Sequence, residues 1–162
     1  MLRPISATRE MFLFLPADCR LSSVNFLMPV TDQRRDFASR YAAAWCNQNP
    51  ASVAAFYAVD GSLSINDGPP ARGRAAIEAE ARAFMTAFPD MRVSFDRLVE
   101  AAGRLQFHWT LTGTYSGPGG TGKRVRISGF EEWRLAADGL IAESRGHFDG
   151  AEYQRQLQRG VD

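Results

Sequence analysis

Metal-binding and redox side chains are scarce in this 162-residue chain, which has two cysteines and two histidines. The histidines, His108 and His147, and the cysteines, Cys19 and Cys46, do not have the spacing of a zinc site. We therefore expect no bound metal. We also expect free thiols rather than a disulfide, because a core of this size needs no covalent cross-link.

An excess of charge and a long apolar run are also missing. The chain has 19 Lys and Arg against 18 Asp and Glu, so electrostatics do not favour nucleic acid or an anionic membrane as partners. No apolar run approaches the roughly 20 residues that a bilayer requires. The glycine-rich stretch 117–120 lacks the strand–loop–helix setting of a phosphate loop. We expect a cytoplasmic protein with no nucleic-acid partner, no membrane partner and no cofactor.

Two parts of the chain differ in character. Residues 1–30 have no sustained hydrophobic period, and the apolar patch 11–15 is too short for a convincing signal-peptide core. Either Met28 is the true start, or residues 1–30 form a genuine flexible or docking arm. We expect residues 31–162 to form one domain, which is large enough for a substantial core.

Periodicity predicts helices first and then strands. Thr31 or Asp32 can cap a helix that ends at Asn49-Pro50, and Asp138-Gly139 is a strong hairpin turn. Helices are expected near 31–47, 51–57, 74–88 and 150–159, and strands near 62–65, 91–101, 104–116, 124–135 and 140–149. This order predicts an α+β fold, with three helices packed on one face of a curved, mainly antiparallel sheet. Such a cone encloses an apolar pocket suited to a small molecule.

Glu131 is the most informative polar residue. Along 124–135, side chains alternate between two faces, which places Glu131 on the same face as Val125, Ile127 and Trp133. A carboxylate on an apolar face is costly unless it is paired, protonated or used. The expected cavity wall is Phe37, Tyr41, Trp45, Phe84, Phe88, Trp109, Glu131 and Trp133.

Several short motifs occur together in a specific order. They are Phe56-Tyr57-Ala58-Val59-Asp60, Gly73-Arg74-Ala75-Ala76-Ile77, the Gly-rich hairpin 117–125, Ser128-Gly129, the stretch 138–143 and Phe148-Asp149. On these motifs, residues 31–159 resemble the SnoaL-like branch of the nuclear transport factor 2-like superfamily. That group includes ketosteroid isomerases, limonene epoxide hydrolases and polyketide cyclases, so the resemblance implies the cone-shaped fold but no single reaction.

The resemblance to ketosteroid isomerase implies roles for two residues. Its carbonyl-polarising tyrosine matches Tyr41 in Arg40-Tyr41-Ala42-Ala43-Ala44, and its strand aspartate falls on Glu131. A protonated Glu131 and the Tyr41 hydroxyl would then form a two-donor oxyanion site. Alternatively, Tyr41 is a core residue and Glu131 pairs with a nearby hydroxyl or arginine.

The general base is less well matched. Asp67 could reach the pocket mouth as a catalytic group, although Asn66-Asp67-Gly68 also suits a turn. Asn66 falls at the asparagine that helps hold water in limonene epoxide hydrolase. The last-strand aspartate of that enzyme corresponds to Gly146, which argues against chemistry of that type.

The remaining ligand-binding candidates are aromatic or titratable. Trp45, Phe84, Trp109 and Trp133 are expected to contact substrate. His147 would do so only if a bulge at Gly146 rotates it inward.

Two classes of function stay open. The first is a cofactor-free isomerase, cyclase or hydrolase that works by proton transfer on a small apolar substrate. The second is a non-catalytic module for small-ligand binding or dimerisation. We also expect a homodimer through the outer sheet face, anchored by Phe130 and surrounded by Gln106, His108, Thr110, Thr112, Arg126 and Arg134. In the rival arrangement, residues 1–30 cover that face of a monomer.

Overall fold

A computed structural model describes residues 30–161. Its elements are α1 (Asp32–Cys46), α2 (Pro50–Ala54), β1 (Tyr57–Ile65), β2 (Ala71–Arg72), α3 (Arg74–Ala87), β3 (Arg92–Ala101), β4 (Arg104–Thr114), β5 (Arg124–Leu135), β6 (Ile141–Phe148) and α4 (Gly150–Arg159). The strands form one sheet in the order β2-β1-β6-β5-β4-β3. All neighbouring strands are antiparallel except β1 and β6, which are parallel. The α+β prediction and the four-strand meander are confirmed.

Local chemistry explains where the helices begin. The Thr31 side chain accepts a hydrogen bond from the backbone N–H of Arg34, and Asp149 accepts one from that of Glu152. These caps satisfy N–H groups that have no partner within the helix. Pro50 opens α2, where its missing N–H costs nothing.

Sequence periodicity misplaced the start of the sheet. The helix expected over 51–57 ends at Ala54, and the strand expected over 62–65 begins earlier, at Tyr57. Tyr57 is opposite Ile141 of β6, and the Ile141 N–H donates to the Phe56 carbonyl. Pairing with a distant strand therefore overrides the local helical pattern. The two-residue strand β2 was not predicted.

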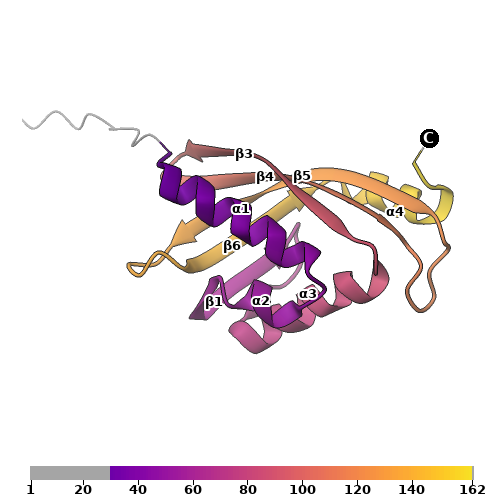
Figure 1. Cartoon of the computed structure of the whole chain (residues 1–162), viewed down its shortest axis with the longest axis horizontal. Helices are drawn as coiled ribbons and strands as arrows, with labels where there is room; N and C mark the ends of the chain where they lie inside the picture. The colour runs from indigo at the N-terminus through magenta and orange to yellow at the C-terminus, as the bar shows by residue number, and fades with distance from the viewer. Residues whose placement is uncertain (1–29, 162) are drawn as a thin grey trace, which may run out of the picture.

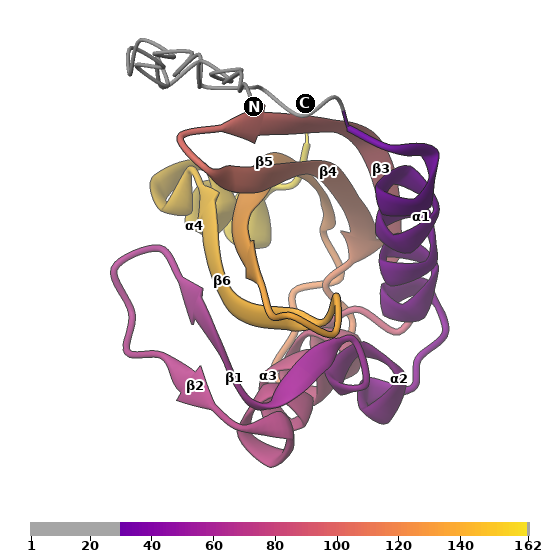
Figure 2. The same ribbon diagram turned by 90° about the vertical axis from the view of Figure 1, so that its left-hand side faces the viewer.

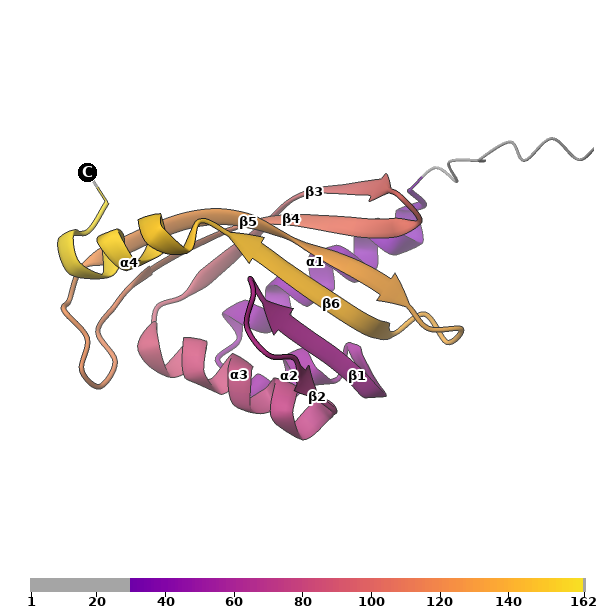
Figure 3. The same ribbon diagram turned by 180° about the vertical axis from the view of Figure 1, so that it is seen from behind.

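The helices and the sheet enclose the interior together. In Figure 1, α1 crosses in front of the sheet, while α2 and α3 lie beside β1. Figure 2 shows the strands curving around the interior, with α1 along the side opposite β6. From behind, β1, β5 and β6 lie in front of α1 (Figure 3). One sheet surface is thus turned toward the helices and the other away from them.

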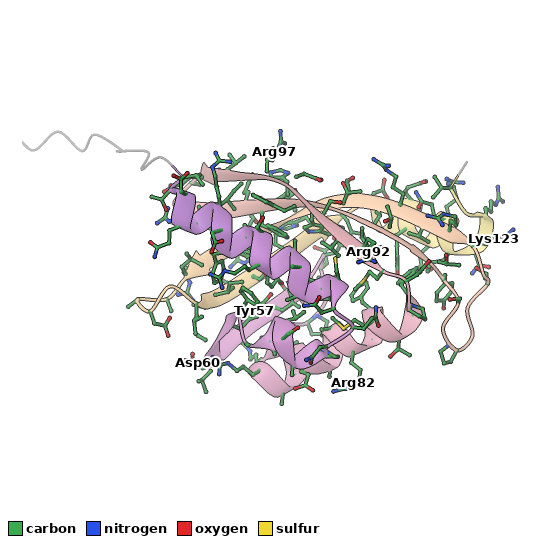
Figure 4. All side chains as sticks on the ribbon, viewed as in Figure 1. Tyr57, Asp60, Arg82, Arg92, Arg97 and Lys123 are labelled. Atoms are coloured by element: carbon green, nitrogen blue, oxygen red, sulfur yellow. The ribbon has the colours of Figure 1, made fainter. Side chains whose placement is uncertain are left out.

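Aromatic side chains dominate the core beneath α1. The Tyr41 ring packs edge-on against Trp133 at 5.1 Å and Phe107 at 5.3 Å between ring centroids. Phe107 in turn stacks on Trp133 at 4.8 Å. Tyr57 is also fully buried, whereas Asp60 on the same strand is exposed at the edge of the molecule (Figure 4).

Helices capable of spanning a bilayer are absent from residues 30–161. The start at Met28 and the N-terminal arm both concern residues outside this range, so these two alternatives stay predictions.

Candidate functional site

An apolar cavity of about 60 Å³ lies between the sheet and the helices. Its wall is formed by Trp45, Leu63, Ile65, Phe84, Val93, Phe107, Trp109, Leu111, Ile127, Glu131, Gly146, Phe148 and Tyr153. Among these described residues, Glu131 carries the only carboxyl group and there is no basic side chain. The cavity is therefore an apolar space with one acidic group in its wall.

Strand pairing places Glu131 at the centre of the sheet. On β5 it lies opposite Phe107 of β4 and Gly146 of β6. A side chain built on Gly146 would have its Cβ 3.9 Å from Cγ of Glu131. Glycine therefore leaves space directly beside the carboxyl group.

Three donors converge on one oxygen of this carboxyl. Oε2 of Glu131 accepts hydrogen bonds from the Ser144 hydroxyl at 2.6 Å, the Trp133 indole at 2.8 Å and the Tyr41 hydroxyl at 3.1 Å. Oε1 has a single, longer contact of 3.4 Å, again with Tyr41. Oε2 is saturated as an acceptor, and Oε1 is the oxygen that retains bonding capacity.

The surroundings act on the pKa of Glu131 in opposite directions. Desolvation by burial is the largest influence and raises the pKa above its ordinary value of 4.5. The hydrogen bonds from Ser144, Trp133 and Tyr41 favour the charged form and lower it. The net direction is upward, so this buried carboxyl holds its proton more tightly than one in water.

Tyr41 lies close to Glu131 but in a different arrangement from the expected oxyanion site. Its hydroxyl bonds to Glu131 and lies 2.9 Å from the Tyr57 hydroxyl, and its side chain is outside the cavity wall. Burial, followed by the nearby Glu131 charge, raises the pKa of both tyrosines well above 10.0, so both stay protonated. Tyr41 therefore supports Glu131, and the two do not point together at a shared vacant position.

The other aromatic candidates divide into two groups. Trp45, Phe84 and Trp109 line the cavity as expected. Trp133 does not line it; its ring is buried in the core, and its indole N–H donates to Glu131. Phe37 and Phe88, also expected in the wall, pack into the surrounding core instead.

Three polar candidates lie outside the cavity. Asp67 is an exposed turn residue, and the Asn66 side chain accepts a hydrogen bond from the backbone N–H of Phe148. The pairing of β5 with β6 is continuous past Gly146, so no bulge between these strands turns His147 inward. His147 lies 2.9 Å from Glu132 and packs on Phe130 on the outer face. None of these three residues lines the cavity that contains Glu131, and their roles as site residues stay predictions.

Ser144, Tyr57 and Tyr153 are the site residues that sequence reasoning missed. Alternation along 140–149 already put Ser144 on the same face as Gly146, but nothing local indicated that its hydroxyl meets Glu131. Tyr57 was assigned to a helix end. Tyr153, on α4, reaches the cavity wall only because the C-terminal helix folds back over β5.

Groups of three or more potential metal ligands are absent from the described residues. The titratable groups in the described cavity wall are Glu131 and Tyr153. Burial raises the pKa of Tyr153, so its hydroxyl is protonated near neutral pH.

Comparison with known proteins gives a consistent fold assignment. A family model described as a SnoaL-like domain matches residues 38–144. A protein with a ketosteroid isomerase-like fold from Catenulispora acidiphila, solved with trimethylamine, has a TM-score of 0.66 at 16% identity, covering 75% of this chain and 92% of that one. A nuclear transport factor 2-like protein of unknown function from Burkholderia pseudomallei has a TM-score of 0.66 at 21% identity, covering 78% and 98%.

A third structure is AclR, a proposed hydroxylase from Streptomyces galilaeus. Its TM-score is 0.64 at 22% identity, and the match covers 77% of this chain and 95% of that one. Similarity at these identities shows the fold alone. No curated protein matches the chain.

Proposed function

Because this chain belongs to the SnoaL-like family, with the family model matching residues 38–144, we propose that it is a cofactor-free enzyme acting on a small apolar molecule. Glu131 is the group that transfers the proton. The reaction class is an isomerisation, cyclisation or hydrolysis that needs acid–base catalysis. Structural neighbours carry names as different as hydroxylase and polyketide cyclase, so their names do not select one reaction.

The unequal environment of the two Glu131 oxygens carries this proposal. A carboxyl that served only to hold the core together would have both oxygens satisfied, because buried polar atoms are rarely left without a partner. Here three donors fix Oε2 and leave Oε1 with one long contact. The side chain is thereby oriented, and one oxygen remains available to a bound molecule.

Proton abstraction next to a carbonyl illustrates the chemistry. Oε1 of the carboxylate takes a proton from the carbon adjacent to the carbonyl, and the C–H electron pair forms the enolate. Glu131 then returns the proton, to the same carbon or to another carbon of the conjugated system. A positioned acid or base of this kind typically accelerates a reaction by about 10²–10⁴-fold.

A non-catalytic ligand-binding module is the second candidate. It is favoured by the absence of another carboxyl among the described cavity-lining residues and by the use of Tyr41 and Trp133 as partners of Glu131. Such a protein would bind the same small molecules without moving protons. A measurement of proton exchange therefore separates the two candidates.

The test uses the exchange of α-hydrogens of cyclopentanone in D₂O, followed by ¹H NMR. Glu131→Gln is the matched variant, because the amide oxygen can take the place of Oε2 while the NH₂ group replaces Oε1. We expect the native protein to accelerate exchange and the variant to lose about 100-fold or more of that acceleration. Equal exchange rates for the two proteins, with thermal unfolding showing both folded, would favour the binding module.

A further inference from the structure

The indole N–H of Trp109 is the one polar group of the described cavity wall that is fully buried and has no hydrogen-bond partner. A buried indole N–H usually donates to an acceptor in the protein, because burial removes the water that would otherwise accept its hydrogen bond and an unpaired donor costs free energy. Trp133 follows this rule, since its N–H donates to Glu131 at 2.8 Å. Two tryptophans on adjacent strands thus differ in a way that requires an explanation.

Strand pairing places Trp109 next to the proposed catalytic carboxyl. Trp109 on β4 lies opposite Gly129 on β5, and Glu131 is the next inward-facing residue along that strand. Cζ2 of Trp109 is only 2.8 Å from the position that a Cβ of Gly129 would occupy, so only glycine allows this close approach. Cζ2 and Nε1 share one edge of the indole, and that edge therefore faces the strand that carries Glu131.

We infer that Trp109 donates its indole N–H to an oxygen of the bound ligand. This inference rests on the proposed function in one respect, namely that the cavity holds a ligand at all. The ligand class follows from the wall: a small, uncharged, mainly apolar molecule with one carbonyl oxygen. Anions are disfavoured beside Glu131 in a cavity whose described wall has no basic side chain.

The size of the cavity limits the enclosed part of the ligand. About 10–15 Å³ of such volume corresponds to one water-sized group, and the cavity measures about 60 Å³. The enclosed part therefore has roughly four to six non-hydrogen atoms. A cyclic five-membered ketone is of this size.

The same geometry assigns Trp109 a place in the reaction. When Glu131 removes an α-proton, negative charge develops on the carbonyl oxygen. A fixed N–H donor in an apolar cavity stabilises that charge more in the transition state than in the ground state. Trp109 would be the oxyanion donor and Glu131 the base.

The inference is tested with cyclopentanone and methylenecyclopentane, which have nearly the same shape and differ in the carbonyl oxygen. The protein is labelled with ¹⁵N-tryptophan, which gives three indole signals that are assigned with Trp→Phe variants. We expect cyclopentanone, and not the hydrocarbon, to move the Trp109 indole proton downfield. The Trp133 signal is the internal control, because its N–H already has a partner.

A second measurement uses Trp109→Phe, which keeps the ring contacts and removes the donor. We expect this variant to bind cyclopentanone about 2- to 10-fold more weakly, with little change for methylenecyclopentane. Equal effects of both ligands on Trp109, or no binding of either, would overturn the inference. If exchange of the cyclopentanone α-hydrogens depends on Glu131 but the Trp109 indole signal does not move, the proposed function holds and Trp109 has no part in it.

Discussion

Replacing Ser144 with alanine should expose the balance that holds Glu131 in the cavity wall. The Ser144 hydroxyl donates to Oε2 of Glu131 at 2.6 Å, and Ser144 is fully buried. A hydrogen bond to a neutral partner contributes about 0.5–1.5 kcal/mol, whereas one to a charged partner contributes about 1.5–3 kcal/mol. The substitution should therefore cost about 1–1.5 kcal/mol more when Glu131 is ionised than when it is protonated.

The sign of the pH dependence follows from the raised pKa of Glu131. Below its ordinary value of 4.5 the carboxyl is protonated in both the folded and unfolded states and has no effect on the pH dependence. As pH rises above 4.5, the unfolded state releases its proton first, so the free energy of unfolding falls until pH exceeds the folded pKa. Ser144→Ala raises the folded pKa further and deepens this loss.

Urea unfolding of both proteins at one pH below and one pH above the measured Glu131 pKa gives the two costs. Carboxyl ¹³C NMR should show directly that the pKa of Glu131 rises in Ser144→Ala. In a Glu131→Gln background, the cost of Ser144→Ala should no longer change with pH. A pH-independent cost in the native background, or an unchanged Glu131 pKa, would refute the account of how this carboxyl is held.

Three further outcomes are expected. Trp133→Phe should destabilise the protein by about 1–3 kcal/mol in urea unfolding, because it loses the hydrogen bond to the buried carboxyl. Trp109→Phe should destabilise it clearly less, because the Trp109 N–H has no partner among the described residues, and equal costs would contradict this. Gly146→Ala should fold normally, because its new methyl lies 3.4 Å or more from its neighbours, but it should weaken cyclopentanone binding in NMR titrations. In Gly129→Ala the new methyl would lie 2.4 Å from a carbonyl oxygen, so the free energy of unfolding should fall by about 1–3 kcal/mol or more. Phe130→Arg should convert a dimer to a monomer in light scattering, and a monomeric native protein at high concentration would exclude the sheet-face dimer.

The outer-face dimer stays a prediction, and the fold identifies the residues that surround Phe130 at its expected centre. Phe130 packs between the rings of His108 and His147, with centroid distances of 5.3 and 4.8 Å. The Thr110 hydroxyl donates to the Asp96 carboxylate at 2.7 Å and lies 2.8 Å from the Ser128 hydroxyl. An aromatic centre surrounded by polar groups is the usual composition of an interface. The alternative cover, the N-terminal arm, lies outside the described residues.

Local pattern was enough to predict the side of the sheet on which Glu131 lies. Alternation has a period of two residues, so the neighbours Val125, Ile127 and Trp133 fix the face without any knowledge of the fold. The Asp138-Gly139 turn likewise fixed the last hairpin, because a two-residue pattern specifies that turn chemically. These inferences hold because each depends on residues a few positions apart.

Tertiary structure alone decided which groups meet at the carboxyl. Tyr41 is 90 residues away in sequence and Ser144 is 13 away, and both reach Glu131 through helix packing and strand pairing. Continuous pairing of β5 with β6 leaves His147 on the outer face, where alternation had placed it, and the Asn66 side chain accepts a hydrogen bond from the backbone N–H of Phe148. Periodicity determines the face on which a side chain lies. Its partner depends on how distant elements align, which is why the sequence pointed to Glu131 and only the fold showed that three donors meet its Oε2 while Oε1 has one long contact.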